Sequence, residues 1–243
     1  MRLLAAAMVA ALTMSCSAFG SGASEEDSFS YDGIEAVYVR AEFLNVEVSG
    51  DDAPSVSMSS EPGTGYRVLH EAEGSRLRIW LEKDWPFGGS GDGTISLQCP
   101  RDVRLKLETV SGHIRVEGME GVHCTVSTIS GGIVLRENHG TLSAASVSGK
   151  ISLDADTGRV IAKTVSGGID GRGLLLSEES SFSTVSGDVD VRLDSDLDDL
   201  RFDLRSLSGR IVVGTVRAER GLRMGTGGAL VRGQSVSGAL IFR

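Results

Sequence analysis

Short stretches of the chain alternate apolar and polar residues and are separated by glycine, a pattern typical of β-strands. In one such stretch Leu105 and Leu107 alternate with polar neighbours, and after a Val-Ser-Gly phrase Ile114 and Val116 do the same. Alternation with a period of two turns one face of each strand inward. The inward parity shifts across Val-Ser-Gly, which predicts a corner whose glycine adopts backbone angles that other residues resist.

The corner phrase recurs along the chain with a nearly constant period. Its serines at positions 111, 130, 148, 166, 186 and 208 are separated by 19, 18, 18, 20 and 22 residues, and a last copy closes the chain. Such a period is typical of solenoids, in which each rung buries a face that its neighbour cannot bury alone. We therefore expect an all-β, β-helix-like solenoid with rungs of about 18–22 residues. The predicted corner glycines are Gly112, Gly131, Gly149, Gly167, Gly187, Gly209 and Gly238.

This register also predicts the ends of the stack. Weaker copies around Gly93 and Gly227 extend the series, and the last copy, which ends in Leu-Ile-Phe, is expected to cap it. Consecutive rungs would place Asp188 beside Arg210, a mildly favourable pair of opposite charges.

The region before the repeats carries short strand patterns without the phrase. Residues 28–92 therefore predict an all-β lead-in of short strands, including a hairpin, before the repeat solenoid of residues 93–243. We expect the lead-in to be continuous with the repeats, so that residues 28–243 form one domain.

The N-terminal residues predict export. Arg2 is followed by an unbroken apolar run over residues 3–12, which is too short to span a bilayer as a helix and fits the core of a secretion signal over residues 1–15. Residues 16–27 are small, polar and acidic, and predict a flexible tether. We therefore expect a protein of the cell envelope, on its periplasmic or cell-surface face.

The end of this signal resembles a bacterial lipoprotein lipobox. In "LTMSC", Cys16 would be the acylated first residue of the mature chain, and the membrane would be reached through that lipid. The match is imperfect, because Thr13 and Ser15 stand where the usual box has leucine and a glycine or alanine. The alternative is an ordinary signal that is cleaved near Ala18.

Together, these segments resemble a known family. The exported N-terminus, the stretch "FSYDGIEAVYVRAEFLNVEVSGDD" and the rungs of "TVSGxIxL" are similar to the bacterial "putative adhesin" family, a domain of unknown function. The resemblance covers most of residues 28–243. The resemblance implies a β-solenoid at the cell envelope, and it assigns no catalytic residue to this chain.

The repeated serine is not expected to act as a nucleophile. A catalytic serine needs a base, an orienting acid and an oxyanion hole at one place, whereas the four histidines are scattered along the chain. Local hydrogen bonds at the corners are the favoured role of these serines.

Two other features are candidates for chemical sites. The acidic segment "DVDVRLDSDLDD" at residues 188–199 could serve carboxylate or calcium chemistry, but the equivalent outward positions on other rungs are not acidic, so a solvated loop is favoured. Cys99 and Cys124 could pair in an oxidising compartment. Cys124 occupies a core position of the repeat, which favours a buried thiol. No metal, cofactor or catalytic residue is expected.

The distribution of charge is more informative. The formal net charge of −9 argues against a general role in binding nucleic acid. From Arg201 to the C-terminus, however, the chain has eight arginines and only two acidic residues, Asp203 and Glu219. Such an end could dock onto phosphate-bearing envelope polymers or lipid headgroups, or it could only guard a sheet edge against aggregation. The candidate contacts with an anionic ligand are Arg217, Arg220, Arg223 and Arg232.

These observations predict a non-enzymatic, envelope-anchored β-solenoid that acts as a binding or adhesion scaffold. The first alternative is an envelope-stress or assembly accessory lipoprotein that binds a protein partner, with strand addition at an open end of the stack as the mode of binding. The second alternative is a β-helical enzyme acting on glycans. The oligomeric state stays open.

Overall fold

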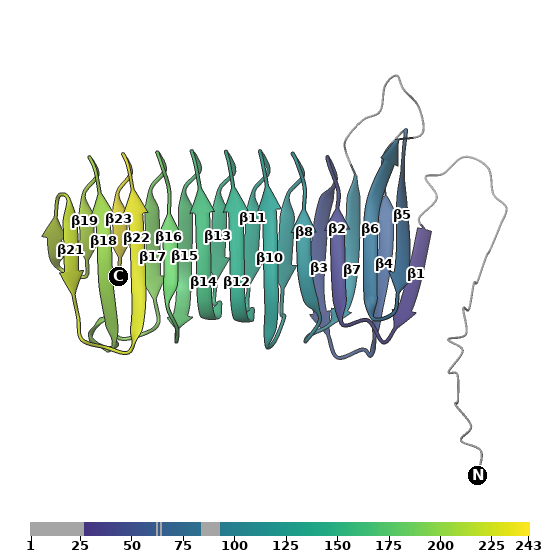
Figure 1. The fold of residues 1–243 in the computed structure, drawn as a ribbon, viewed down its shortest axis with the longest axis horizontal. Coiled ribbons are helices and arrows are strands. Elements are labelled where there is room, and N and C mark those ends of the chain that lie inside the picture. Colours follow the sequence, from purple (N-terminus) through teal and green to yellow (C-terminus); the bar gives the residue numbers. More distant parts are fainter. Residues whose placement is uncertain (1–26, 62, 64, 84–92) are drawn as a thin grey trace, which may run out of the picture.

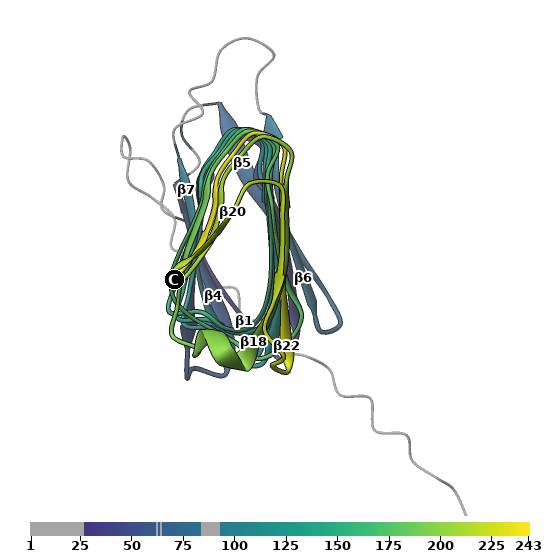
Figure 2. The same ribbon diagram turned by 90° about the vertical axis from the view of Figure 1, so that its left-hand side faces the viewer.

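The structure is a computed structural model that describes residues 27–61, 63, 65–83 and 93–243. The expected signal, Cys16 and the tether up to residue 26 lie outside the described residues. Two sheets face each other and are joined rung by rung into a flattened solenoid (Figures 1 and 2). Seen along the stack, successive rungs superimpose (Figure 2). The prediction of an all-β solenoid is confirmed.

Each rung contributes one strand to each sheet. In spatial order, sheet A contains β1 (Asp27–Asp32), β4 (Ser55–Glu61), β7 (Thr94–Pro100), β3 (Asn45–Asp51), β9 (Ile114–Glu117), β11 (Ile133–Arg136), β13 (Ile151–Asp154), β15 (Ile169–Leu176), β17 (Val189–Leu193), β23 (Leu240–Phe242), β19 (Ile211–Val213) and β20 (Val216–Ala218).

Sheet B contains β5 (Tyr66–Glu73), β6 (Arg76–Lys83), β2 (Ala36–Arg40), β8 (Arg104–Glu108), β10 (Val122–Thr128), β12 (His139–Ser146), β14 (Thr157–Thr164), β16 (Ser180–Ser183), β22 (Ala229–Ser235), β18 (Leu200–Ser206) and β21 (Gly221–Met224). A short 3-10 helix, η1 (Leu197–Asp199), precedes β18. Pairs inside the stack are parallel, and antiparallel strands occur at its two ends.

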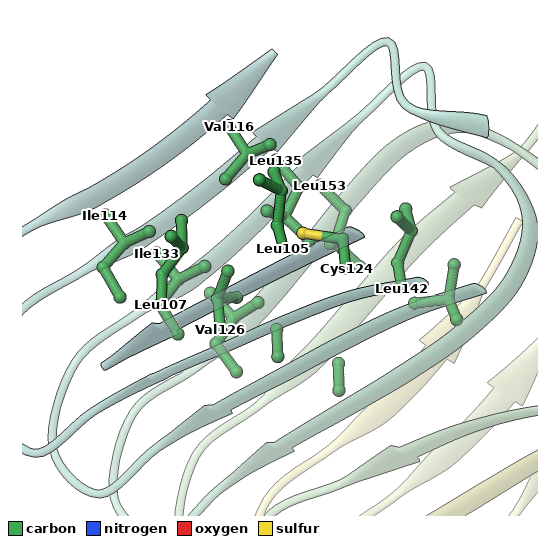
Figure 3. Packing of buried hydrophobic residues seen from close by; sticks show 14 of the residues in the cluster. Leu105, Leu107, Ile114, Val116, Cys124, Val126, Ile133, Leu135, Leu142 and Leu153 are labelled. Carbon is green, nitrogen blue, oxygen red and sulfur yellow. The ribbon is translucent and has the colours of Figure 1, made fainter. Parts of the chain in front are cut away.

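The core lies between the two sheets and is built from ladders of like residues. Ile133 pairs with Ile114 on one side and with Ile151 on the other, and all three are fully buried. Figure 3 shows the facing ladders, with Leu105, Cys124 and Leu142 on sheet B. Each rung therefore buries its inward face against its neighbours, as the alternation predicts.

The spatial order of rungs departs from the chain order at both ends. The first rung, β2–β3, lies between the β6–β7 rung and the β8–β9 rung. At the other end, β20 and β21 run antiparallel along the last strands, and the chain then returns to insert β22–β23 between β16–β17 and β18–β19 (Figure 1, where the last strands are yellow). Each end of the chain thus threads one rung into the interior of the stack.

This threading corrects three sequence predictions. The last copy of the phrase is an internal rung, so the prediction that it caps the stack is wrong. The weaker copies are also misplaced, because β3 separates the rung after Gly93 from the next one, and Gly227 approaches Asp199 rather than a corner glycine. Asp188 and Arg210 are not neighbours either, since the Asp188 carboxylate accepts a hydrogen bond from the inserted Ala239 N–H at 2.7 Å.

The corner glycines stack on one another along one edge of the solenoid. At each of the seven positions, an added Cβ would lie 1.7–2.0 Å from a backbone carbonyl oxygen of the neighbouring rung. None of the seven has a positive φ. The prediction that these glycines adopt backbone angles that other residues resist is therefore wrong, and the narrow space between rungs is what requires glycine here. The order of contact, which follows the threading, is Leu44, Gly112, Gly131, Gly149, Gly167, Gly187, Gly238 and Gly209.

The residue three positions before each corner glycine closes the corner. It is a buried Thr or Ser whose hydroxyl oxygen accepts a hydrogen bond from the glycine N–H at 2.7–3.1 Å. The buried hydroxyl group thus satisfies a backbone donor that the turn would otherwise leave unpaired.

The opposite corner holds a buried acid. Asp156 is completely buried, and its Oδ1 accepts hydrogen bonds from the backbone and side-chain N–H groups of Asn138, at 2.9 and 3.0 Å. Its Oδ2 is buried without a partner. Burial raises the pKa of Asp156 from 3.8 to about 6.

Asp156 should make stability depend on pH. Because its folded pKa lies above the unfolded value, the stabilisation is complete below about pH 4 and is lost as the pH rises to about 6, a change of about 3 kcal/mol in the free energy of unfolding. We expect Asp156→Asn to flatten this loss, so that the variant gains stability relative to the wild type between pH 4 and pH 7. Denaturant unfolding of both proteins across this range measures the difference, and parallel pH profiles would contradict the assignment.

Candidate functional site

The repeated Ser has a structural role in the rungs of the C-terminal half. The hydroxyls of Ser166, Ser186 and Ser208 each donate to a backbone carbonyl oxygen of the neighbouring rung, at 3.0–3.4 Å. These bonds tie rungs together and leave the serine at an exposed corner, which gives the phrase the role of a building unit.

An aliphatic edge accompanies these serines. The residue before each repeated serine is Val, Ile or Leu, and its side chain is 39–74% exposed. The edge is one residue wide, so it forms a narrow line along the stack and not a broad patch. Its members in spatial order are Val110, Ile129, Val147, Val165, Val185, Val236 and Leu207.

The acidic segment does not form a carboxylate cluster. Asp190 forms an ion pair with Arg243 across β17 and β23, and Asp196 caps η1 by accepting a hydrogen bond from Asp198 N–H at 3.1 Å. Within the residues that the structure describes, no group of three His, Cys, Asp or Glu side chains could hold a metal ion. Asp188, Asp190 and Asp196 thus have partners within the fold.

The two described cysteines are separate, buried thiols. Neither forms a disulfide, and burial raises the pKa of both Cys99 and Cys124 to about 12. The interpretation of Cys124 as a buried core thiol is confirmed. Such thiols are protonated at neutral pH and are poor nucleophiles.

The predicted arginines divide into two groups. Arg217 on β20, Arg220 in the following turn and Arg223 on β21 lie on the strands that close the C-terminal end of the stack. Together with Arg205 on β18 we call them the basic tip. Arg232 does not belong to it, because β22 is inserted two strands from the end and Arg232 forms an ion pair with Glu179.

The basic tip keeps unpaired cations. Asp203 Oδ1 lies 3.5 Å from Arg205 Nε and 3.3 Å from Arg223 Nε, and the Arg223 guanidinium beside it lowers the pKa of this carboxyl. Arg217 and Arg220 are exposed and form no ion pair with any described residue, including the nearby Glu219. The tip can therefore offer guanidinium groups to an anionic ligand.

A second cluster of exposed side chains was not predicted from the sequence. The outward positions of β6, β2 and β8 bring together two aromatic residues and three cations on the outer face of sheet B. They border a shallow hollow of about 170 Å³. We call this cluster the aromatic–basic platform, and its members are Tyr38, Arg40, Arg78, Trp80, Lys106 and Glu108.

The signal for the platform is present in the sequence, but only in separate pieces. "AVYVR", "RLRIWLEK" and "RLKLE" each alternate core residues with basic or aromatic ones. Their strands become neighbours only because the β2–β3 rung is threaded between later ones. Sequence order alone does not place Tyr38 beside Arg78 and Lys106.

The protein is a two-sheet β-solenoid with a cationic end. Residues 89–236 match the family model described as Toastrack DUF4097, and the chain belongs to this family. A search of curated proteins found no match. No described helix is long and apolar enough to cross a membrane.

Several solved structures are similar. A putative adhesin from Bacteroides fragilis NCTC 9343 has 11% sequence identity, coverage of 91% of this chain and 98% of its own, and a TM-score of 0.54, which shows a shared fold. A putative adhesin from Parabacteroides distasonis ATCC 8503 has 13% identity, coverage of 92% and 98%, and a TM-score of 0.46. A putative lipid binding protein from the same strain has 12% identity, coverage of 89% and 94%, and a TM-score of 0.44.

Proposed function

We propose that the protein is a non-enzymatic binding scaffold of the cell envelope, anchored by a lipid on Cys16, which binds an anionic envelope polymer at its basic tip. The observation that carries the proposal is the pair of exposed, unpaired arginines Arg217 and Arg220 at one end of a stack of rungs. A guanidinium binds phosphate or carboxylate through two parallel hydrogen bonds. The adhesin role named for the similar Bacteroides fragilis structure agrees with a binding function.

The geometry favours a ligand away from the anchoring membrane. β1 begins at residue 27 at one end of sheet A (Figure 1), and the strand pairs make β20 the last of its twelve strands, at the other end. At about 4.8 Å per strand, the basic tip lies about 50 Å from the end nearest the tether. A polymer of an adjacent envelope layer therefore suits the tip better than headgroups of the membrane that holds Cys16.

Retention on immobilised polyphosphate tests the tip. We expect retention to fall steeply as salt rises, and the double variant Arg217→Gln with Arg220→Gln to bind about tenfold more weakly without a change in melting temperature. Arg232→Gln is the matched control, because it removes the same charge from a paired position off the tip. Retention that is independent of salt and is the same in the double variant would refute the proposal. Aggregation of the double variant with unchanged binding would instead support the alternative, in which these arginines only protect the sheet edge from aggregation.

One observation favours the alternative of a protein partner. β5, at the N-terminal end of sheet B, has eight residues and pairs only with β6 in the described chain. A long edge strand of this kind can accept an added strand from another protein. Co-purification of an envelope protein that is lost when a proline is introduced into β5 would favour this function over polymer binding.

The anchor has its own prediction. Cys16→Ala should release the protein from the membrane fraction, or leave an uncleaved precursor, because stable attachment needs the acyl chains that lipoprotein processing supplies. Metabolic labelling with a fatty acid measures the change directly. Labelling that persists in Cys16→Ala would show that Cys16 is not the acylated residue.

A further inference from the structure

We infer that the aromatic–basic platform is a second binding site, which takes an acidic sugar residue of a glycan chain. Two aromatic rings and three cations meet there on three neighbouring strands, β6, β2 and β8, near the N-terminal end of sheet B (Figure 1). The site lies at the other end of the stack from the basic tip, so the inference does not depend on the tip.

The strand register sets the arrangement of the platform. One row across the strands contains Arg78, Tyr38 and Lys106. The next row on the same face, two residues further along each strand, contains Trp80, Arg40 and Glu108. Neighbours in a row are about 4.8 Å apart along the sheet, so each aromatic ring lies beside a cation.

The charge of the platform is basic within an acidic chain. The outward side chains of β6, β2 and β8 include five cations and two acids, Glu82 and Glu108. Lys106 and Glu108 form an ion pair at 2.9 Å, and Arg78 pairs with Glu73 of β5 at 3.9 Å, whereas Arg40 has no ion pair in the described part of the chain. The five cations are Arg40, Arg76, Arg78, Arg104 and Lys106.

The aromatic residues point to a ligand with rings as well as charge. Tyr38 is 40% exposed, and Trp80 is half-buried beside Arg40. The negative face of an aromatic ring packs on the weakly positive C–H face of a sugar, and the adjacent cations bind its acidic group. The hollow is open and smaller than the 300–1,000 Å³ of typical small-molecule pockets, which suits one residue of a polymer lying across the sheet.

Binding of defined oligosaccharides tests the site. The measurement uses the full chain carrying Arg217→Gln and Arg220→Gln, so that the tip does not contribute. The probes are alginate oligosaccharides, which have rings and carboxylates, dextran oligosaccharides, which have rings alone, and polyphosphate, which has charge alone. We expect measurable binding of alginate only, weakened about tenfold by Tyr38→Thr and about tenfold by Arg40→Gln.

Lys163→Gln is the matched control. Lys163 faces outward on β14 in the same row as Arg40, but four strands away from β2. Its substitution should leave alginate binding unchanged, and equal melting temperatures would show that the platform variants are folded. Binding of polyphosphate that is as tight as that of alginate and insensitive to Tyr38→Thr would overturn the inference, as would the absence of alginate binding.

Discussion

Gly167→Ala is expected to destabilise the solenoid by at least about 2–3 kcal/mol, whereas Gly168→Ala, one residue along, changes stability by less than about 0.5 kcal/mol. A Cβ on Gly167 would lie 2.0 Å from the carbonyl oxygen of Gly149, and this nearest neighbour is a backbone atom that cannot move aside as the end of a side chain could. The two rungs must separate, which weakens the parallel hydrogen bonds on both sides of the corner. A Cβ on Gly168 would meet its nearest backbone atom, Asp188 O, at an ordinary 3.4 Å.

Thermal unfolding distinguishes the two variants. For a domain of this size, the change at Gly167 corresponds to a fall of about 5–10 °C in melting temperature. Because both residues lie in the same phrase and neither has a positive φ, the comparison isolates the space between rungs. Equal shifts for Gly167→Ala and Gly168→Ala would contradict the stacked-glycine explanation of the repeat.

Ending the chain at Gly228 is expected to detach the strands that lie beyond the inserted rung. β18 pairs with β22, and β19 pairs with β23, so removal of β22–β23 leaves a gap between these strands and the rest of the stack. The core also loses three large, fully buried side chains, worth about 5–9 kcal/mol in total. These side chains are Val231, Leu240 and Phe242.

Hydrogen exchange measures this effect region by region. We expect fast exchange over β18–β21 in the truncated protein, with protection kept in β8–β14, because rungs in a solenoid depend mainly on their neighbours. A chain that lacks only Arg243 is the control and should keep the protection of β18–β21, because it loses the ion pair with Asp190 but retains both inserted strands. Protection of β18–β21 in the truncated protein would mean that these strands hold to the stack without the inserted rung.

The repeating part of the fold could be predicted because each rung carries its own information. Alternation sets which side chains face inward, and the period sets the length of a rung, so the sequence alone aligns Ile114, Ile133 and Ile151. The threading at the ends could not be predicted. β2 and β22 alternate apolar and polar residues as other strands of the stack do, and their positions are decided by antiparallel strands that turn the chain around.

The same limit applies to the candidate sites. The arginines near the C-terminus stand out as a compositional excess, but composition does not show that Arg232 is drawn into the stack beside Glu179. Tyr38, Trp80 and Lys106 come from segments that are far apart in sequence and meet only through the inserted rung. Sites made by side chains from threaded strands need the strand order before they can be recognised.

Photo-crosslinking in intact cells tests the central claim, a scaffold that binds an anionic envelope polymer at its tip, most directly. A photo-reactive residue at position 217 should attach the protein to envelope polymer that survives protease digestion, whereas the same residue at position 163, on the side of the stack, should not. Crosslinks from position 217 only to other proteins, or equal attachment to polymer from both positions, would contradict the account.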